Sequence, residues 1–268
     1  MGMPRNLYLV RHGQSEGNAL RRQFEETGDM SLFSENFMNL HESQYMLTEK
    51  GIKQAKLAGK WLKKNVSNPF YRLLVSNNNR AMQTAAYLGL ENANWMIDFN
   101  LRERENGLFN VLSPLEQETA FKKQKQFHDS QPFLFRPPQG ESVADVAQRI
   151  KIVLDTLARE CDGQDVVIVC HGHVIRTFRI ILERMTLSES NNYLTTEEDW
   201  GRVPNCAIVH YTRENPNCLS DDYSKYLNRV RIIRPAGGGA LEDDFSLIQR
   251  RKYSNEDLLQ EVERCRKK

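Results

Sequence analysis

The chain has 268 residues, of which 40% are hydrophobic and 27% are charged, as expected for a globular protein with a buried core. Its 37 Lys and Arg nearly cancel its 35 Asp and Glu, leaving a formal net charge of +2. No overall field therefore draws the chain to nucleic acid or to a membrane, and neither is expected as a partner. The five cysteines form no Cys-x-x-Cys pair, which argues against a zinc or redox site and indicates reduced thiols in the cytoplasm.

Short apolar runs alternate with helical patterns along the chain, which is typical of an α/β layer fold. In chain order the patterns predict a strand at 7–10, a helix at 48–64, a strand at 73–76, a helix at 80–88, a strand at 95–99, a helix at 142–160, a strand at 166–170, a helix at 174–185 and a strand at 207–211. The runs are rich in Val, Ile and Leu, as in strands that are buried on both faces. We expect a three-layer sandwich with a mostly parallel central sheet flanked by helices.

Three stretches do not fit this alternation. Residues 19–47 and 108–140 are predicted to be insertions that form lids or binding loops, the second with a helix whose solvated face carries Lys122, Lys123 and Lys125. Beyond residue 212 the pattern weakens, so we expect one domain over 1–212 and a C-terminal extension over 213–268. The extension is predicted to be partly flexible at three consecutive glycines and to end in a polar helix capped by Ser254.

Two of the predicted strands run directly into a His-Gly pair. Arg11-His12-Gly13 follows the first strand, and His171-Gly172 follows the strand at 166–170. Because ligands bind at the carboxyl ends of strands in an open α/β sheet, both histidines are expected at one crevice. His173 lies two residues further on; a position at the rim or in solvent is the favoured interpretation for its side chain.

Two more strand ends bring charged residues to the same edge. Arg80 opens a helix after a turn of asparagines, where a helix N-terminus favours an anion. Glu103 and its neighbours Arg102, Arg104 and Glu105 follow the weak strand at 95–99. Arginine side chains match phosphate oxygens, a neutral imidazole can attack phosphorus, and a carboxylic acid can protonate an alkoxide. The combination indicates metal-independent transfer of a phosphoryl group.

At this point the chain resembles the histidine phosphatase superfamily, in its phosphoglycerate mutase-like branch. The resemblance covers residues 5 to about 212 and is closest to fungal- and plant-type phosphatase-like members. It rests on the pattern Arg-His-Gly-x-Ser-x-x-Asn at residues 11–18 and on partner motifs in family order. These are residues 76–85, residues 101–107, Gly140-Glu141-Ser142 and His171-Gly172.

The resemblance implies a role for each matching residue. It makes His12 the phosphorylated nucleophile and places Arg11, Asn18, Arg80 and His171 in the phosphate pocket, with His171 also counted as catalytic. Glu103 matches the general acid, because the family has glycine four residues later and Gly107 fits; Glu105 is the competing carboxylate. Asn205-Cys206 resembles the Asn-Cys/Ser-x motif that the family has at the last strand of this domain. Arg102 and Arg104 are expected to be solvated charges, and Glu141 is explained by the dipole of the helix that it opens.

These residues leave three functions to compare. The leading prediction is a phosphatase that acts on a small-molecule phosphate ester or a phosphoprotein, with no metal and no cofactor. A phosphoglycerate mutase is the alternative, although Glu118-Thr119-Ala120 only faintly resembles the mutase insert and no Arg-Arg pair follows it. A catalytically inactive phospho-ligand binder is disfavoured, because both the nucleophile and the acid are present.

Overall fold

A mixed β-sheet forms the centre of the molecule, and four of its strands run parallel. The computed structural model describes residues 2–29, 31, 34, 37, 39–110, 116, 119, 121–196, 203–215, 224–236 and 241–266. Within them the strands are β1 (Asn6–Arg11), β2 (Arg72–Val75), β3 (Trp95–Ile97), β4 (Asp165–Cys170), β5 (Ile208–Thr212), β6 (Arg229–Arg234), β7 (Leu241–Glu242) and β8 (Ser246–Leu247). Their order is β3-β2-β4-β1-β5-β6-β7, with β8 paired to β6. Strands β3, β2, β4 and β1 are parallel, whereas β5 is antiparallel to β1 and to β6.

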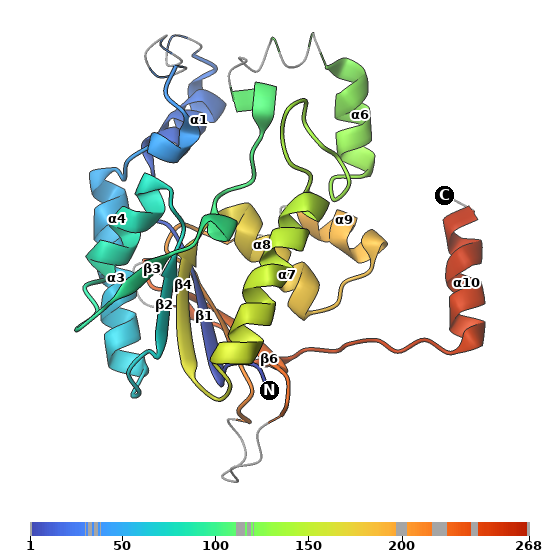
Figure 1. The fold of residues 1–268 in the computed structure, drawn as a ribbon. Helices are drawn as coiled ribbons and strands as arrows, with labels where there is room; N and C mark the ends of the chain where they lie inside the picture. The colour runs from blue at the N-terminus through green and yellow to red at the C-terminus, as the bar shows by residue number, and fades with distance from the viewer. Residues whose placement is uncertain are drawn as a thin grey trace.

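Helices cover both faces of this sheet and complete the three expected layers (Figure 1). Helices α3 (Glu49–Asn65) and α4 (Asn79–Leu88) pack on one face, and α7 (Val143–Glu160) and α8 (Gly172–Leu182) pack on the other. Alternate side chains of β1 supply the two cores: Leu7 and Leu9 join α7 and α8, while Tyr8 and Val10 join α3 and α4. The five strands and four helices predicted from the sequence are confirmed to within a few residues, and so is the fold class.

The two insertions contain helical elements. The first holds most of α1 (Glu16–Thr27) and a short 3-10 helix, η2 (Glu42–Gln44); the second holds α6 (Lys122–Ser130) and overlaps η4 (Gly107–Asn110). Lys122 is exposed on α6, as predicted, whereas the side chains of Lys123 and Lys125 lie outside the described part of the structure. Two further elements are η3 (Phe99–Leu101), just before Glu103, and α9 (Leu187–Thr195), after α8. The sequence patterns predicted neither α1 nor α9.

The C-terminal extension contributes to the sheet. All five residues of β5 pair with residues 229–233 of β6, and β7 and β8 pair with β6. The chain then continues to α10 (Asn255–Arg266), which stands apart from the rest of the molecule in Figure 1. Ser254 and Asp257 form the reciprocal hydrogen bonds of a helix cap at its start, confirming that predicted helix. The three glycines expected to be flexible lie outside the described residues, and the domain boundary at 212 stays a prediction.

No helix in the described ranges combines the length and the apolar character needed to span a membrane.

Candidate active site

The parallel register of the sheet brings the two His-Gly motifs together. Arg11 pairs with Cys170, so His12 and His171 leave adjacent strands at the same level. The backbone N–H of His12 donates to the carbonyl of Cys170 at 2.9 Å, and the N–H of Ser76, after β2, donates to the carbonyl of Val169 at 3.0 Å. Three strand ends therefore meet at one edge, as the sequence predicted.

His12 is held as a neutral imidazole with one defined tautomer. Its Nδ1 lies 2.7 Å from the carbonyl of Gly13, and because a carbonyl can only accept, the ring proton sits on Nδ1. Burial, reinforced by Arg80 and Arg11, holds the pKa of His12 well below its usual 6.5. Nε2 therefore carries no proton at neutral pH and accepts a hydrogen bond from Arg80, and the ring is 2% exposed. Gly13 cannot carry a side chain here, because a Cβ atom would lie 2.5 Å from the carbonyl oxygen of Gly51.

His171 lies directly behind His12. The two ring centroids are 5.1 Å apart, and His171 is fully buried. Its Nε2 lies 2.8 Å from the hydroxyl of Ser76, while its Nδ1 has no hydrogen-bond partner among the described residues. Burial lowers its pKa well below 6.5, and Arg80 adds to the effect. His171 is thus a second neutral imidazole beside the first, but it does not line the open cavity described below.

Two buried arginines flank His12. Arg80, on the first turn of α4, is 5% exposed, donates to the carbonyl of Glu42, and places its Nε 3.3 Å from Nε2 of His12. Arg11 donates to the carbonyl of Val203 at 2.6 Å, and its Nε is buried without a hydrogen-bond partner among the described residues. Burial lowers the pKa of Arg11, which nevertheless remains a cation. A buried cation with an unused donor is the group that an anion would satisfy.

Asn18 belongs to the same wall and is fixed by its neighbours. Its side-chain oxygen accepts hydrogen bonds from the backbone N–H of Ser15 at 3.4 Å and from Asn205 at 3.1 Å. The same amide group of Asn205 donates to the carbonyl of His12 at 3.0 Å. Asn205 therefore ties the segment just before β5 to the loop that carries His12 and Asn18. Because the oxygen of Asn18 is used as an acceptor, its amide N–H groups are what it can offer to an anion.

A cavity of about 670 Å³ opens over these groups. Its walls include the predicted residues Arg11, His12, Asn18, Arg80 and Glu103. The size fits a small ligand, since ligand pockets usually measure roughly 300 to 1,000 Å³. No group of three or more His, Cys, Asp or Glu within the described part of the chain is arranged to hold a metal ion.

Glu103 stands at the cavity wall and Glu105 does not. One carboxylate oxygen of Glu103 accepts the backbone N–H of Arg104 at 2.9 Å and lies 3.9 Å from Nδ1 of His173. Glu105 instead accepts from Asn110 at 2.9 Å and from the backbone N–H of Gly107. His173 also lines the cavity, at its partly exposed rim, and desolvation there lowers its pKa to about 4.

Neither arginine next to Glu103 lines the cavity, and Arg104 is buried, contrary to the expectation of a solvated charge, whereas the side chain of Arg102 stays 27% exposed. Arg104 is 5% exposed and donates to the carbonyls of Glu141 and Phe135. Arg102 stacks on the ring of Phe99 at 4.2 Å and donates to the carboxylate of Glu141 at 2.6 Å. Ser142, and not Glu141, caps the N-terminus of α7. The carboxylate of Glu141 forms ion pairs with Arg102 and Arg149, in addition to lying near the positive end of the helix dipole.

Several cavity residues were missed by the sequence reasoning. Arg21, Arg176 and Glu42 also line the cavity. Arg21 lies three residues after Asn18 on α1, and Arg176 lies three residues after His173 on α8, so helical spacing could have placed both beside known site residues. Glu42 comes from η2, where no periodic pattern points to it; burial, partly offset by Arg80, raises its pKa to about 7.

Comparisons with known proteins agree with this geometry. A family model described as the histidine phosphatase superfamily (branch 1) matches residues 7–215. A 2,3-bisphosphoglycerate-dependent phosphoglycerate mutase of Methylorubrum populi is 32% identical over 196 residues, covering 69% of this chain and 82% of the mutase. A 6-phosphofructo-2-kinase/fructose-2,6-bisphosphatase of Aquarana catesbeiana is 28% identical over 65% of this chain, which spans 32% of that enzyme. A solved mycobacterial glucosyl-3-phosphoglycerate phosphatase with inorganic phosphate shares the fold, with a TM-score of 0.59 and 22% identity over 77% of this chain and 89% of that chain.

Proposed function

The chain belongs to the histidine phosphatase superfamily, branch 1, and from this premise we propose that it is a phosphatase that hydrolyses phosphomonoesters through a phosphohistidine on His12, without a metal ion. The observation that carries the proposal is the state of His12. Its proton is engaged by the carbonyl of Gly13, and its unprotonated Nε2 accepts a hydrogen bond from Nε of Arg80 at 3.3 Å. A neutral nitrogen held beside fixed cations is suited to attack a phosphate dianion.

In the first half-reaction, Nε2 of His12 attacks phosphorus and the bond from phosphorus to the ester oxygen breaks. The carboxyl group of Glu103 gives its proton to the departing oxygen. Arg11, Arg80 and Asn18 bind the phosphoryl oxygens, and His171 supports the phosphate pocket from behind His12. Fixed donors of this kind stabilise charge without having to reorganise during the reaction.

In the second half-reaction, water replaces the departed alcohol. The carboxylate of Glu103 removes a proton from the water, whose oxygen attacks phosphorus while the phosphorus–nitrogen bond breaks. Inorganic phosphate leaves, and both His12 and Glu103 return to their starting states. The cycle balances without a cofactor.

The charge of the cavity supports a small, strongly anionic substrate. Arg21 and Arg176 add two cations beyond the phosphate pocket, and both lie close enough to His173 to lower its pKa. Because Glu103 lies next to His173, these arginines stand on the side that receives the leaving group. A leaving group with its own negative charge is therefore favoured over a neutral one, and a free small molecule over a phosphoprotein.

A phosphoglycerate mutase remains the alternative, because it uses the same phosphohistidine and returns the phosphoryl group to the substrate instead of to water. The similarity to a bacterial mutase favours it. The sequence has no Arg-Arg pair after Glu118-Thr119-Ala120, where Lys122-Lys123 stands instead, and this favours the phosphatase. Glu118 and Ala120 lie outside the described residues.

A panel of phosphate esters separates these functions. We expect release of inorganic phosphate from alkyl phosphates, with 3-phosphoglycerate hydrolysed faster than glycerol 3-phosphate, since the two differ by a carboxylate in place of a hydroxymethyl group. Conversion of 3-phosphoglycerate to 2-phosphoglycerate without phosphate release would identify a mutase instead. Binding of these esters without any turnover would identify an inactive phospho-ligand binder.

A further inference from the structure

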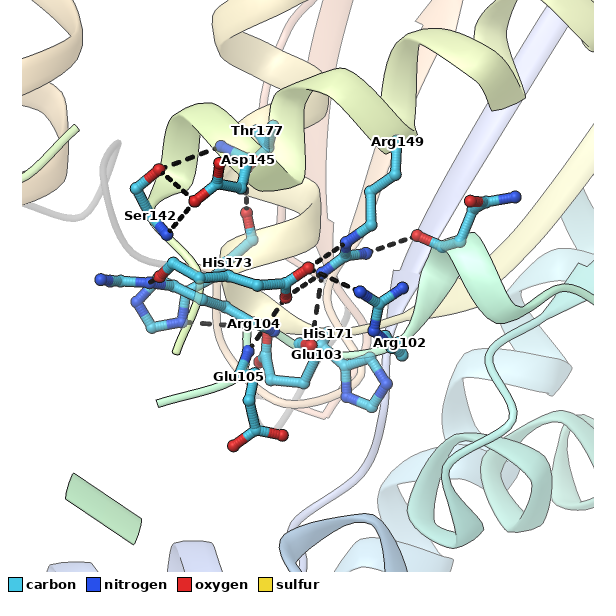
Figure 2. Close-up of polar contacts among 12 residues, drawn as sticks. Arg102, Glu103, Arg104, Glu105, Ser142, Asp145, Arg149, His171, His173 and Thr177 are labelled. Carbon is cyan, nitrogen blue, oxygen red and sulfur yellow. Dashed lines mark hydrogen bonds and ion pairs between the residues drawn. The ribbon is translucent and has the colours of Figure 1, made fainter. Parts of the chain in front are cut away.

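Glu103 sits on a short loop between η3 and η4 that belongs to no helix or strand. An acid on such a loop must be held by other parts of the molecule, because a proton donor works only within hydrogen-bond reach of the leaving oxygen. Figure 2 shows this loop together with the start of α7, where Arg149 extends toward Glu103 and Arg102. The contacts that fix the loop come from Arg149 and from Glu141, which lies just before α7.

Arg149 holds the backbone on which the acid is mounted. Its side chain is 7% exposed, and its guanidinium donates to the carbonyls of Asn100 and Glu103, the latter at 3.3 Å. The same guanidinium donates to both carboxylate oxygens of Glu141, at 3.1 and 3.0 Å. The planar guanidinium of Arg149, on the second turn of α7, therefore joins Asn100, Glu103 and the partly buried carboxylate of Glu141.

Glu141 holds the residues on either side of the acid. One of its oxygens accepts from the side chain of Arg102 at 2.6 Å, and the other accepts from the backbone N–H of Glu105 at 3.1 Å. Arg104 closes the arrangement by donating to the carbonyl of Glu141 at 2.8 Å. The backbone of Glu103 is thus fixed directly, and its neighbours on both sides are fixed through Glu141.

We propose that Arg149 and Glu141 are positioning residues that set the place of the Glu103 carboxyl relative to the leaving oxygen. The proposal rests on the proposed function, in which Glu103 is the general acid. Neither residue lines the cavity, so both act through Glu103 and not on the substrate. Misplacing a catalytic group by about 1 Å can lower a rate by roughly 100-fold, which gives the scale of the effect.

The test is Arg149→Lys, read on two esters. A lysine keeps the positive charge next to Glu141, but one ammonium cannot reproduce a planar fork that serves three residues. We expect kcat/KM, which covers the steps up to departure of the leaving group, to fall about 10- to 100-fold on glycerol 3-phosphate, which needs its leaving oxygen protonated, and less than about 3-fold on nitrophenyl phosphate, which does not. In a Glu103→Gln background, the same lysine should change neither rate by more than about 2-fold, because residues that act as one unit are not additive.

Glu183→Gln is the matched control. Glu183 pairs with Arg179 at 2.9 Å, and the two side chains are 17% and 9% exposed, nearly the same as the 16% and 7% of Glu141 and Arg149. This control should lower the melting temperature without changing the ratio of the two ester rates. Should Arg149→Lys fail to fold, Glu141→Gln, which keeps the shape of the side chain, should show the same ester-selective loss.

Equal losses on both esters, or a full further loss in the Glu103→Gln background, would overturn the proposal and leave a purely structural ion pair. A Glu103→Gln variant that lowers kcat/KM equally for both esters would instead remove the acid role assumed under the proposed function, and with it the basis of this proposal.

Discussion

His12 and Glu103 divide the proposed chemistry between a buried nitrogen and a carboxylate at the wall of the cavity. The residues that carry this chemistry, including Arg11, Arg80 and Asn18, could be identified from the sequence because each follows a strand end or a short specific motif. Arg21, Arg176 and Glu42 could not, since they enter the cavity through helices and an insertion whose placement depends on tertiary packing.

If Glu103 protonates the leaving oxygen, the effect of replacing it should depend on the leaving group. An alkyl phosphate needs its oxygen protonated as the ester bond breaks, whereas nitrophenolate leaves unaided. Glu103→Gln should therefore lower kcat/KM, which covers the steps up to departure of the leaving group, about 10²- to 10⁴-fold on an alkyl phosphate and much less on a nitrophenyl ester. Glu105→Gln is the control and should do little to either, because Glu105 lies outside the cavity wall. A large alkyl-selective loss at Glu105 would reverse the assignment.

Among the secondary-structure elements, those with a clear apolar period were predicted and those without one were missed. Helix α1 has no buried residue and is instead fixed by its cap at Ser15, so no apolar stripe marks it. Strand β6 alternates arginine with Val230 and Ile232, so its sequence contains no continuous apolar run that would predict a strand. Its Arg231 packs on the rings of Trp61 and Phe245, which replaces the burial that an aliphatic side chain would give.

The turn at Gly107 gives a prediction about the loop that carries the acid. Gly107 has φ of 54°, and a Cβ atom there would lie 2.1 Å from the carbonyl oxygen of Pro138. Gly107→Ala should therefore destabilise the fold by more than the roughly 1 to 2 kcal/mol of a left-handed residue alone, and should slow alkyl phosphate hydrolysis. Gly163→Ala is the matched control, because Gly163 has φ of 70° but nothing lies within 4 Å of the added Cβ atom. In urea unfolding, this control should lose only the free energy that a left-handed backbone costs. Equal stability losses for the two variants would contradict the described contact.

At the scale of the whole molecule, buried neutral histidines link stability to pH. Burial holds the pKa values of His12, His171 and His210 well below 6.5. In the unfolded chain these rings take up protons as the pH falls through about 6.5, whereas the folded rings do not. The unfolded state therefore binds more protons, and the stability present above pH 6.5 is lost as the pH falls toward the lowered folded values.

His173, whose pKa is lowered to about 4, adds a fourth ring. Between pH 6.5 and 5.5 each ring costs about 1 kcal/mol, because the unfolded ring is already half protonated at pH 6.5, while Glu42, whose pKa is raised to about 7, offsets about one of the four. Urea unfolding should show a net loss of about 3 kcal/mol between pH 6.5 and 5.5. His210 packs against the rings of Tyr8 and Phe245 and does not line the cavity. His210→Gln should therefore remove about one histidine's share of this pH-dependent loss of stability. Stability that stays flat or rises on acidification would contradict the neutral state of these rings.

The charges of the cavity also predict how activity responds to chelators. Arg11, Arg80 and Asn18 are proposed to neutralise and bind the phosphoryl oxygens, so phosphate release from an alkyl phosphate should continue unchanged after dialysis against EDTA. Loss of activity that magnesium or zinc restores would show that a metal ion carries part of the charge stabilisation assigned to the arginines.

The central claim is that the phosphoryl group passes through His12, and trapping the intermediate tests it most directly. Enzyme mixed with ³²P-labelled alkyl phosphate and quenched in alkali within milliseconds should carry label that survives base but is lost in acid, as expected for phosphorus bonded to nitrogen. Peptide mapping should place that label on His12, and His12→Ala should carry none and show no turnover. Wild-type turnover by His12→Ala, or label found on another residue, would contradict the account.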